Sequence, residues 1–225
     1  GSNATGNAGN VGIGTTTPTA RLMVKDSSDS GFDSGIAIIR SANSQTGYIN
    51  MVGGAMNFNS PSIPIIFRQA GTEKMRISNS GNVTKPNSSA FSANTSAPGF
   101  TVGTTEVKVT YNSEQVDDNG NYDTTNARFT APVTGTYLIG TANTCKIISG
   151  VTVYMAIYIR RNGGSTSYRF RGGGVDNDVN DWFGISGSVV IPLAASDYIE
   201  LWAYANSGSF QIVNTEGHFY GYLIG

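Results

Sequence analysis

The second half of the chain contains segments in which apolar residues occupy every other position, as expected of β-strands. In residues 151–159 one side of the predicted strand is apolar throughout: Val151, Val153, Met155, Ile157 and Ile159. Residues 198–204 repeat this alternation, whereas 218–224 is apolar or aromatic on both sides. Strands of this kind fill a sandwich core with one face, so we predict an antiparallel all-β fold here.

The first 85 residues predict shorter strands separated by frequent turns. The candidate strands are 21–24, 36–40, 48–52, 65–68 and 74–77, each bounded by Gly, Asn, Ser or Pro. We therefore predict a short-stranded module over 1–85, a linker over 86–89 and a second module over 90–225. Residues 1–4, with the sequence GSNA, are typical of an expression scar, so we expect the native N-terminal region to be missing.

Composition narrows the classes of function. Only 13% of the residues are charged, with 14 Lys and Arg against 15 Asp and Glu. The cationic residues are scattered, whereas binding to nucleic acid needs a basic stripe, so no nucleic-acid partner is expected. No apolar run approaches the roughly 18 residues of a membrane span, so no membrane insertion is expected either.

The single histidine and the single cysteine limit the available chemistry. A zinc site built from Cys and His or a disulfide framework needs more of these residues. His218 begins an apolar strand, which favours a structural role over a catalytic one. Cys145 lies in a strand-like segment and is expected to be a small buried apolar residue. We therefore predict that the protein is not an enzyme and has no catalytic residues.

A partial repeat links the two ends of the first module. Gly9-Asn10-Val11 recurs as residues 81–83, which suggests a modular array. The stretches NVGIGTTTPTARLMV (10–24) and TEKMRISNSGNV (72–83) resemble the shaft modules of bacteriophage tail fibres. This resemblance covers most of residues 9–85 and implies a trimeric β-shaft, because such fibres are typically trimeric.

The second module resembles the C1q/TNF-like jelly rolls. The matching stretches are 90–93 (AFSA), 109–112 (VTYN), 120–123 (GNYD), 128–138 (RFTAPVTGTYL), 186–193 (SGSVVIPL), 197–201 (DYIEL) and 219–223 (FYGYL). Two glycines of the family pattern are replaced, by Ala127 and Ser196, and both positions fall in turns. The resemblance implies a jelly-roll sandwich of about ten strands whose core includes Phe129, Tyr137, Phe219 and Leu223.

Members of the C1q/TNF-like family assemble as homotrimers through aromatic faces, so the resemblance also implies a homotrimer. Several aromatic residues alternate with the expected core positions, and burying each large side chain stabilises by about 1.5–3 kcal/mol. The expected interface residues are Tyr154, Tyr158, Tyr198, Trp202, Tyr204, Tyr220 and Tyr222. The alternative is that the tips of these side chains simply remain in water.

One loop offers two further candidate sites. Asp176, Asp178 and Asp181 present alternating oxygen ligands that suit Ca²⁺, although the Gly and the distal Glu of an EF-hand loop are missing. No other cofactor is expected. The same region combines ring faces with hydrogen-bonding groups, as a receptor-binding site for a carbohydrate requires. Its candidate residues are Tyr168, Arg169, Arg171, Asp176, Asn177, Asp178, Asp181 and Trp182. The alternatives are a solvated loop and a core strand that begins at Trp182.

Together these features predict a receptor-binding tail fibre protein, a trimeric adhesin of the virion that acts outside the cell. Its expected partners are a bacterial surface receptor, either a glycan or an outer-membrane protein, and other virion tail proteins bound through the missing N-terminal region. Several weak contacts acting together would give firm attachment. Three alternatives stay open: a secreted bacterial C1q-like binding protein, a depolymerase tailspike and a purely structural fibre segment.

Overall fold

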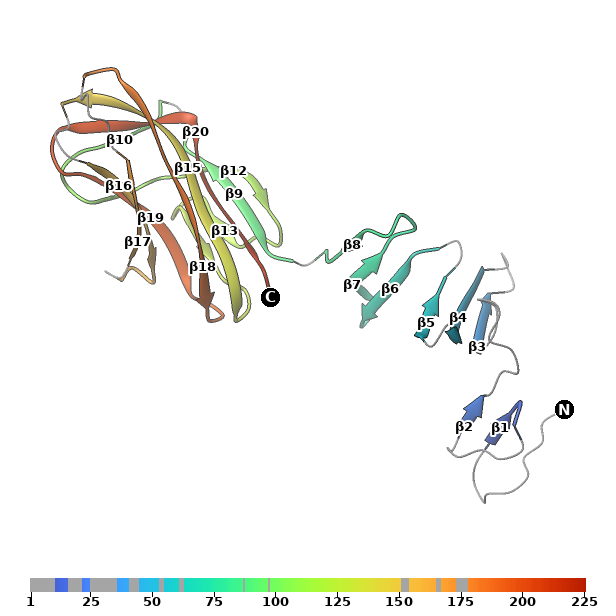
Figure 1. The fold of residues 1–225 in the computed structure, drawn as a ribbon. Coiled ribbons are helices and arrows are strands. Elements are labelled where there is room, and N and C mark those ends of the chain that lie inside the picture. Colours follow the sequence, from blue (N-terminus) through green and yellow to red (C-terminus); the bar gives the residue numbers. More distant parts are fainter. Residues whose placement is uncertain are drawn as a thin grey trace. The chain divides into compact units, whose positions relative to one another are not determined.

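The computed structural model describes residues 11–15, 22–24, 36–40, 45–52, 55–60, 63–86, 88–96, 98–150, 154–164, 167–172 and 178–225. Every regular element in these ranges is a β-strand, so the all-β prediction is confirmed. No helix that could span a membrane occurs in these ranges. The chain divides into two compact units, Gly1–Pro86 and Asn87–Gly225 (Figure 1). This division lies within the predicted 86–89 linker.

The N-terminal unit contains three small sheets among its described residues. β1 (Val11–Ile13) and β2 (Leu22–Val24) form a parallel pair. β3 (Ile36–Arg40), β4 (Gln45–Val52) and β5 (Ala55–Asn59) form an antiparallel sheet. β6 (Ile65–Gln69), β7 (Thr72–Ile77) and β8 (Val83–Thr84) form another. Each of the five short strands predicted from the pattern overlaps one of these strands.

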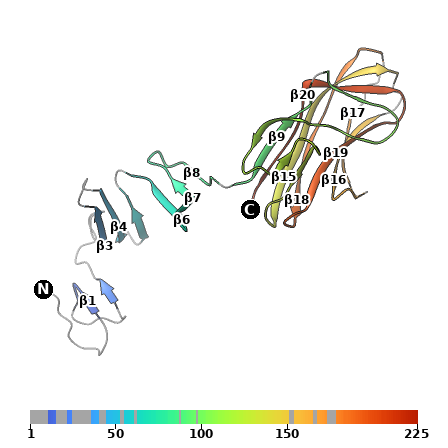
Figure 2. The ribbon, with the colours of Figure 1, turned by 180° about the vertical axis from the view of Figure 1, so that it is seen from behind.

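The C-terminal unit is a sandwich of two antiparallel sheets (Figures 1 and 2). Sheet 1 has the order β12-β9-β20-β15-β18, with β10 also paired to β20; sheet 2 has the order β13-β14-β19-β16-β17, with β11 also paired to β19. The strands of sheet 1 are β9 (Ala90–Asn94), β10 (Phe100–Val102), β12 (Ser113–Asp117), β15 (Gly135–Ser149), β18 (Trp182–Leu193) and β20 (Ser209–Leu223). Those of sheet 2 are β11 (Val107–Lys108), β13 (Tyr122–Asp123), β14 (Arg128–Thr130), β16 (Met155–Arg161), β17 (Ser167–Gly172) and β19 (Tyr198–Ala205).

One hydrophobic core lies between the two sheets of this sandwich. The alternation predicted for 151–159 is confirmed where the structure describes it, because Met155, Ile157 and Ile159 all belong to the core. Residues 151–153 lie outside the described ranges. Ile199, Leu201 and Ala203 of β19 face the same core, as their alternation predicts.

The core residues expected from the family resemblance occupy these positions. Phe129, Tyr137 and Phe219 are fully buried, and Leu223 packs against the core from the end of β20. Cys145 is buried and unpaired, as predicted. The described strands of the sandwich number twelve rather than about ten, because short strands such as β11 and β13 extend sheet 2 at its edges.

Candidate functional site

The two sheets present outer faces of opposite chemical character. Because side chains alternate along each strand, the positions between the core residues of sheet 1 point away from the sandwich. We call the central group of these positions the neutral face; its residues are Ala90, Ser92, Thr136, Leu138, Gly140, Ala142, Ser186, Ser188, Val190, His218, Tyr220 and Tyr222. The same side of the sheet continues beyond this group with Thr144, Lys146 and Trp182 at one end. None of the twelve residues of the neutral face is Asp, Glu, Lys or Arg.

The register brings the large side chains of the neutral face together. Leu138 of β15 pairs with Val190 of β18 on one side and with Tyr222 of β20 on the other. Val190 is 55% exposed and Tyr222 is 48% exposed in the single chain. The ring of Tyr220 lies across Gly140, where an added Cβ would come within 2.6 Å of it. The middle of this face is therefore apolar surface that is largely open in the single chain.

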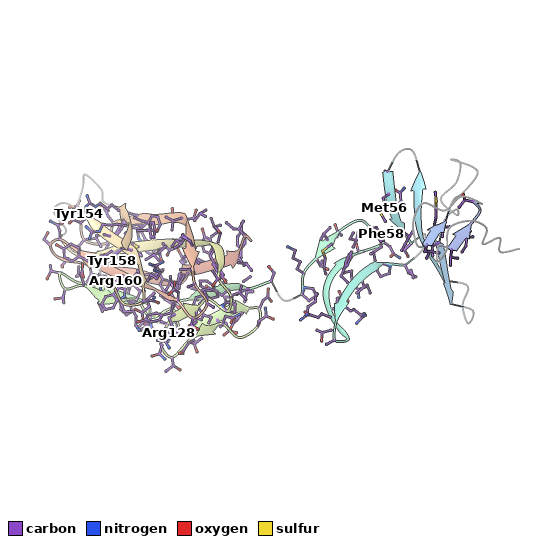
Figure 3. The ribbon with its side chains drawn as sticks, turned by 90° about the horizontal axis from the view of Figure 1, so that it is seen from below. Met56, Phe58, Arg128, Tyr154, Tyr158 and Arg160 are labelled. Atoms are coloured by element: carbon purple, nitrogen blue, oxygen red, sulfur yellow. The ribbon has the colours of Figure 1, made fainter. Side chains whose placement is uncertain are left out.

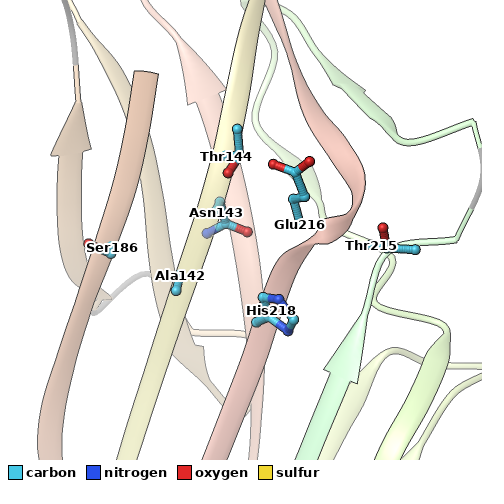
Figure 4. Close-up of a pocket in the computed structure, with 7 residues that line it drawn as sticks. All are labelled: Ala142, Asn143, Thr144, Ser186, Thr215, Glu216 and His218. Atoms are coloured by element: carbon cyan, nitrogen blue, oxygen red, sulfur yellow. The ribbon is translucent and has the colours of Figure 1, made fainter. Parts of the chain in front are cut away.

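A shallow pocket of about 400 Å³ opens at the margin of the neutral face, where β20 bulges away from β15 (Figure 4). Its lining includes Ala142, Thr144, Ser186, Glu216 and His218. Thr215, which also lines the pocket, has a φ of 60°, a strained value for a β-branched residue. Figure 4 shows Glu216 extending from β20 toward Thr144 on β15. The lining carries a single carboxylate, which is too few for a hard-metal site.

The outer face of sheet 2 is built from cationic side chains stacked on aromatic rings. We call it the arginine face; its residues are Glu106, Lys108, Arg128, Tyr154, Tyr158, Arg160, Arg169, Arg171, Tyr198, Glu200, Trp202 and Tyr204. One side of β16 carries Tyr158 and Arg160, and Tyr154 lies just before the first residue of this strand (Figure 3). This face therefore combines ring surfaces with hydrogen-bond donors.

The rings of the arginine face hold the guanidinium groups in place. The Arg171 guanidinium carbon lies 4.6 Å from the centre of the Tyr154 ring, and that of Arg169 lies 5.2 Å from the centre of the Tyr158 ring. Arg160 stacks on Trp202 at 4.4 Å and on Tyr158 at 5.2 Å. Each such contact contributes roughly 0.5–1 kcal/mol at an exposed site and more where water is excluded.

Two ion pairs neutralise part of this positive charge. Arg160 donates a hydrogen bond to the Glu106 carboxylate, and Lys108 Nζ lies 3.1 Å from Glu200 Oε1. The indole Nε1 of Trp202 donates to the same Glu200 carboxylate at 3.2 Å. Arg169 and Arg171 form no ion pair or hydrogen bond with the residues that the structure describes.

Tyr158 is the most enclosed residue of the arginine face. Burial raises the pKa of its phenol, and its hydroxyl lies beside Glu106 without a hydrogen bond of regular geometry. That hydroxyl, followed by the Arg160 guanidinium, lowers the pKa of the Glu106 carboxyl. The face therefore keeps Glu106 ionised and Tyr158 neutral over a wide pH range.

The aromatic residues predicted for the trimer interface do not form one surface. Tyr220 and Tyr222 belong to the neutral face, whereas Tyr154, Tyr198, Trp202 and Tyr204 belong to the arginine face. The prediction for Tyr158 needs a correction, because Tyr158 is only 1% exposed in the single chain. Arg160 and Arg169 already cover its ring, so almost none of its surface is left for another subunit.

The residues predicted for receptor binding do not lie on one surface either. Arg169 and Arg171 point outward from β17, whereas Tyr168, the residue before Arg169, lies on the opposite side of that strand. Trp182 is 59% exposed on sheet 1, with Lys146 Nζ 5.8 Å from its ring centre. Phe183, the next residue, packs against the core. The sequence did not indicate that the aromatic neighbours of Arg169 and Arg171 come from β16, because that pairing depends on the sheet register.

The predicted calcium loop is only partly described. Asp176 and Asn177 lie outside the described ranges. Asp178 and Asp181 are exposed and belong to one turn, in which the Asp181 amide donates to the Asp178 carbonyl at 3.0 Å. The described residues contain no group of three or more Asp, Glu, His or Cys that could hold a metal. Calcium binding therefore stays a prediction.

Comparison with known proteins adds to this picture. No family model matches the chain. The uncharacterized protein YqcC of Bacillus subtilis is 31% identical over 102 residues, which are 45% of this chain and 28% of YqcC. This chain thus matches little more than a quarter of the length of that relative.

Solved structures resemble the chain over about three-fifths of its length. Eiger TNF from S. frugiperda has a TM-score of 0.50 and 8% identity, and the match covers 62% of this chain and 94% of that one. The globular domain of zebrafish complement 1qA has a TM-score of 0.46 and 18% identity, covering 61% and 98%. Murine APRIL has a TM-score of 0.46 and 13% identity, covering 61% and 99%. The sandwich is a jelly roll of the C1q/TNF type.

Proposed function

We propose that the chain is a homotrimeric receptor-binding fibre protein of the tail-fibre type, located in the virion and attaching it to a bacterial surface. Other tail proteins of the virion would be its further partners. The observation that carries this proposal is that no hydrophobic side chain of the N-terminal unit is buried among those whose exposure the structure gives, a set that leaves out most of β3 and β4. A unit without a core of its own needs further copies of the chain to form one.

Apolar side chains of the N-terminal unit are open to solvent in the single chain. Met56 and Phe58 lie on the same side of β5 and are 63% and 61% exposed (Figure 3). Leu22, Phe67 and Val83, on other strands of the unit, are each more than half exposed. Burying one such side chain stabilises by about 1.5–3 kcal/mol. Packing of three copies around an axis would supply the missing core, as in the fibre shafts that residues 9–85 resemble.

The neutral face supports the same symmetry in the C-terminal unit. A face that meets copies of itself around an axis must avoid bringing like charges together. The neutral face meets this condition, whereas the arginine face would bring unpaired guanidinium groups of several subunits close to each other. We therefore place the trimer interface at the neutral face. Of the seven predicted interface aromatics, this arrangement retains Tyr220 and Tyr222.

Attachment by such a trimer is multivalent. Three sandwiches on one shaft present three equivalent receptor sites, and linked sites can exceed the affinity of a single one by roughly 10²–10⁴-fold. The arginine faces would point away from the axis and stay accessible to a receptor. Binding, without a chemical reaction, is the activity that this arrangement suits.

The experiment is binding of the fluorescently labelled full chain to bacterial cells, starting with Bacillus subtilis, with Val190→Lys as the trimer-breaking variant. We expect saturable binding by the wild type and at least tenfold weaker binding by the variant, because avidity is lost. Val133→Lys is the matched control, since Val133 is similarly exposed, at 48%, in a turn outside the neutral face. Equal binding by wild type and Val190→Lys would contradict a multivalent adhesin.

A second candidate is a bacterially encoded binding protein of the same architecture. The identity with a Bacillus protein favours it. Antibody detection distinguishes the two: a virion protein sediments with phage particles in a density gradient, whereas a bacterial protein is found at the surface of cells that release no particles.

A further inference from the structure

We propose that the arginine face binds an acidic polysaccharide, whose carboxylates are held by Arg169 and Arg171. This inference rests on the proposed function and deepens it, because it names the receptor class. The proposed site combines Tyr154 and Tyr158, which the sequence analysis assigned to the subunit interface, with Arg169 and Arg171, which it assigned to the receptor-binding loop.

The first argument is preorganised donor groups. A guanidinium group carries five N–H donors in a rigid plane, and stacking on a ring leaves its edge free to bind a carboxylate with two hydrogen bonds. Arg169 and Arg171 are stacked in this way on Tyr158 and Tyr154. Both side chains are exposed, and their donors have no acceptor among the described residues. Because the rings restrict these side chains, less entropy is lost when a ligand binds.

The second argument is spacing. Arg169 and Arg171 are two residues apart on one strand, so their backbones are separated by about 6.5 Å along it. Both point to the same side of β17, which lies at the edge of sheet 2. A row of guanidinium groups along a strand suits a linear polymer with repeated negative charges better than a small, single anion.

The third argument is charge. The arginine face and its margin carry five cationic side chains against three carboxylates, those of Glu106, Asp123 and Glu200. The whole chain, in contrast, has a formal net charge of −1. The face is therefore a local positive surface on a weakly acidic protein, which favours an anionic ligand.

The aromatic rings of the arginine face favour a polymer of acidic sugars over an anionic polymer without sugar rings. Tyr154, Trp202 and Tyr204 are half-buried beside the arginines, and the Tyr154 and Tyr204 rings are 6.1 Å apart. Partly exposed rings of this kind pack on the apolar faces of pyranose sugars, which a glycerol phosphate chain lacks. A polymer of uronic acids offers carboxylates and sugar faces together, so it matches both features of the surface.

The test measures binding of the full chain to polygalacturonate by biolayer interferometry, with dextran as the neutral polysaccharide and poly-glutamate as an acidic polymer without sugars. We expect binding to polygalacturonate at least tenfold tighter than to either, weakening as salt is raised. The double variant Arg169→Gln with Arg171→Gln should lose at least tenfold in affinity. Arg68→Gln is the matched control, because Arg68 is an exposed arginine of β6 that forms no ion pair with any residue of the described ranges.

Equal binding to dextran, equal binding to poly-glutamate, or unchanged binding by the double variant would each overturn the assignment. The same variants in the cell assay separate this inference from the proposed function. Cell binding that survives the double substitution would overturn the inference and leave the adhesin intact. Arginine-dependent binding to polygalacturonate without binding to cells would leave the site intact and count against the adhesin.

Discussion

Ala127 and Ser196 are two of the sandwich residues that hold a side chain in the left-handed region of backbone conformation. Ala127 has a φ of 45° and Ser196 a φ of 73°. These are the positions at which the C1q/TNF pattern has glycine, so the resemblance indicated the backbone conformation correctly although the residues differ. For a residue with a Cβ, this conformation is unfavourable by about 1–2 kcal/mol.

Ser196→Gly should therefore stabilise the protein. The strain that it relieves, about 1–2 kcal/mol, is partly offset by the greater entropy of glycine in the unfolded chain, so we expect a net gain of roughly 0.5–1 kcal/mol. Denaturant unfolding at one fixed protein concentration measures it. Ala195→Gly in the same turn is the control, because Ala195 is not among the residues with positive φ. This control should destabilise; equal effects of the two substitutions would refute the strain argument.

The buried thiol of Cys145 should make the protein less stable in alkali. Burial raises the pKa of this thiol from 9.0 to about 12. Above pH 9 the unfolded chain releases the thiol proton while the folded chain retains it, so stability falls as the pH rises. We expect a loss of about 1 kcal/mol between pH 8 and pH 10 from this group.

The variant Cys145→Ala isolates this contribution. It should be less stable than the wild type at pH 8, because a buried side chain is shortened, yet its stability should decline less between pH 8 and pH 10. Parallel pH profiles for the two proteins would show that the thiol does not contribute.

At the scale of elements, strand pattern was the most predictable feature. The alternation in β16 and β19 identified which side faces the core, because a half-buried strand has a period of two. The same alternation could not predict which strands pair in the same sheet, because strand pairing brings together residues that are distant in sequence. Tyr220 and Tyr154 therefore looked equivalent in the sequence, although β20 and β16 belong to different sheets.

β5 of the N-terminal unit provides a test at this scale. If copies of the chain cover Met56 and Phe58, the double substitution Met56→Asp with Phe58→Asp places charges in a shared core and should open the N-terminal unit. Limited proteolysis should then cut residues 45–60 at least tenfold faster, while the sandwich stays intact.

Asn57→Asp is the matched control for β5, because it adds a charge to the other side of the same strand. Its cleavage rate should stay close to that of the wild type. Equal protection of the double variant and the wild type would mean that nothing covers this side of β5.

For the whole molecule, the aromatic residues that the sequence analysis assigned to one trimer interface belong to two different outer faces of the sandwich. In the proposed trimer, the neutral face packs against other copies of the chain and the arginine face stays open to a ligand. Composition predicted the class of fold. It could not predict this division, because each face is assembled from at least four strands that meet only in the folded sandwich.

The native mass tests the central claim most directly. Light scattering coupled to gel filtration of the full chain should give about 71 kDa, three times the chain mass of 23.6 kDa, and should not change when the protein is diluted tenfold. A mass of 23.6 kDa at all concentrations would contradict the account, because the exposed apolar residues of the N-terminal unit and the neutral face would then have no partner.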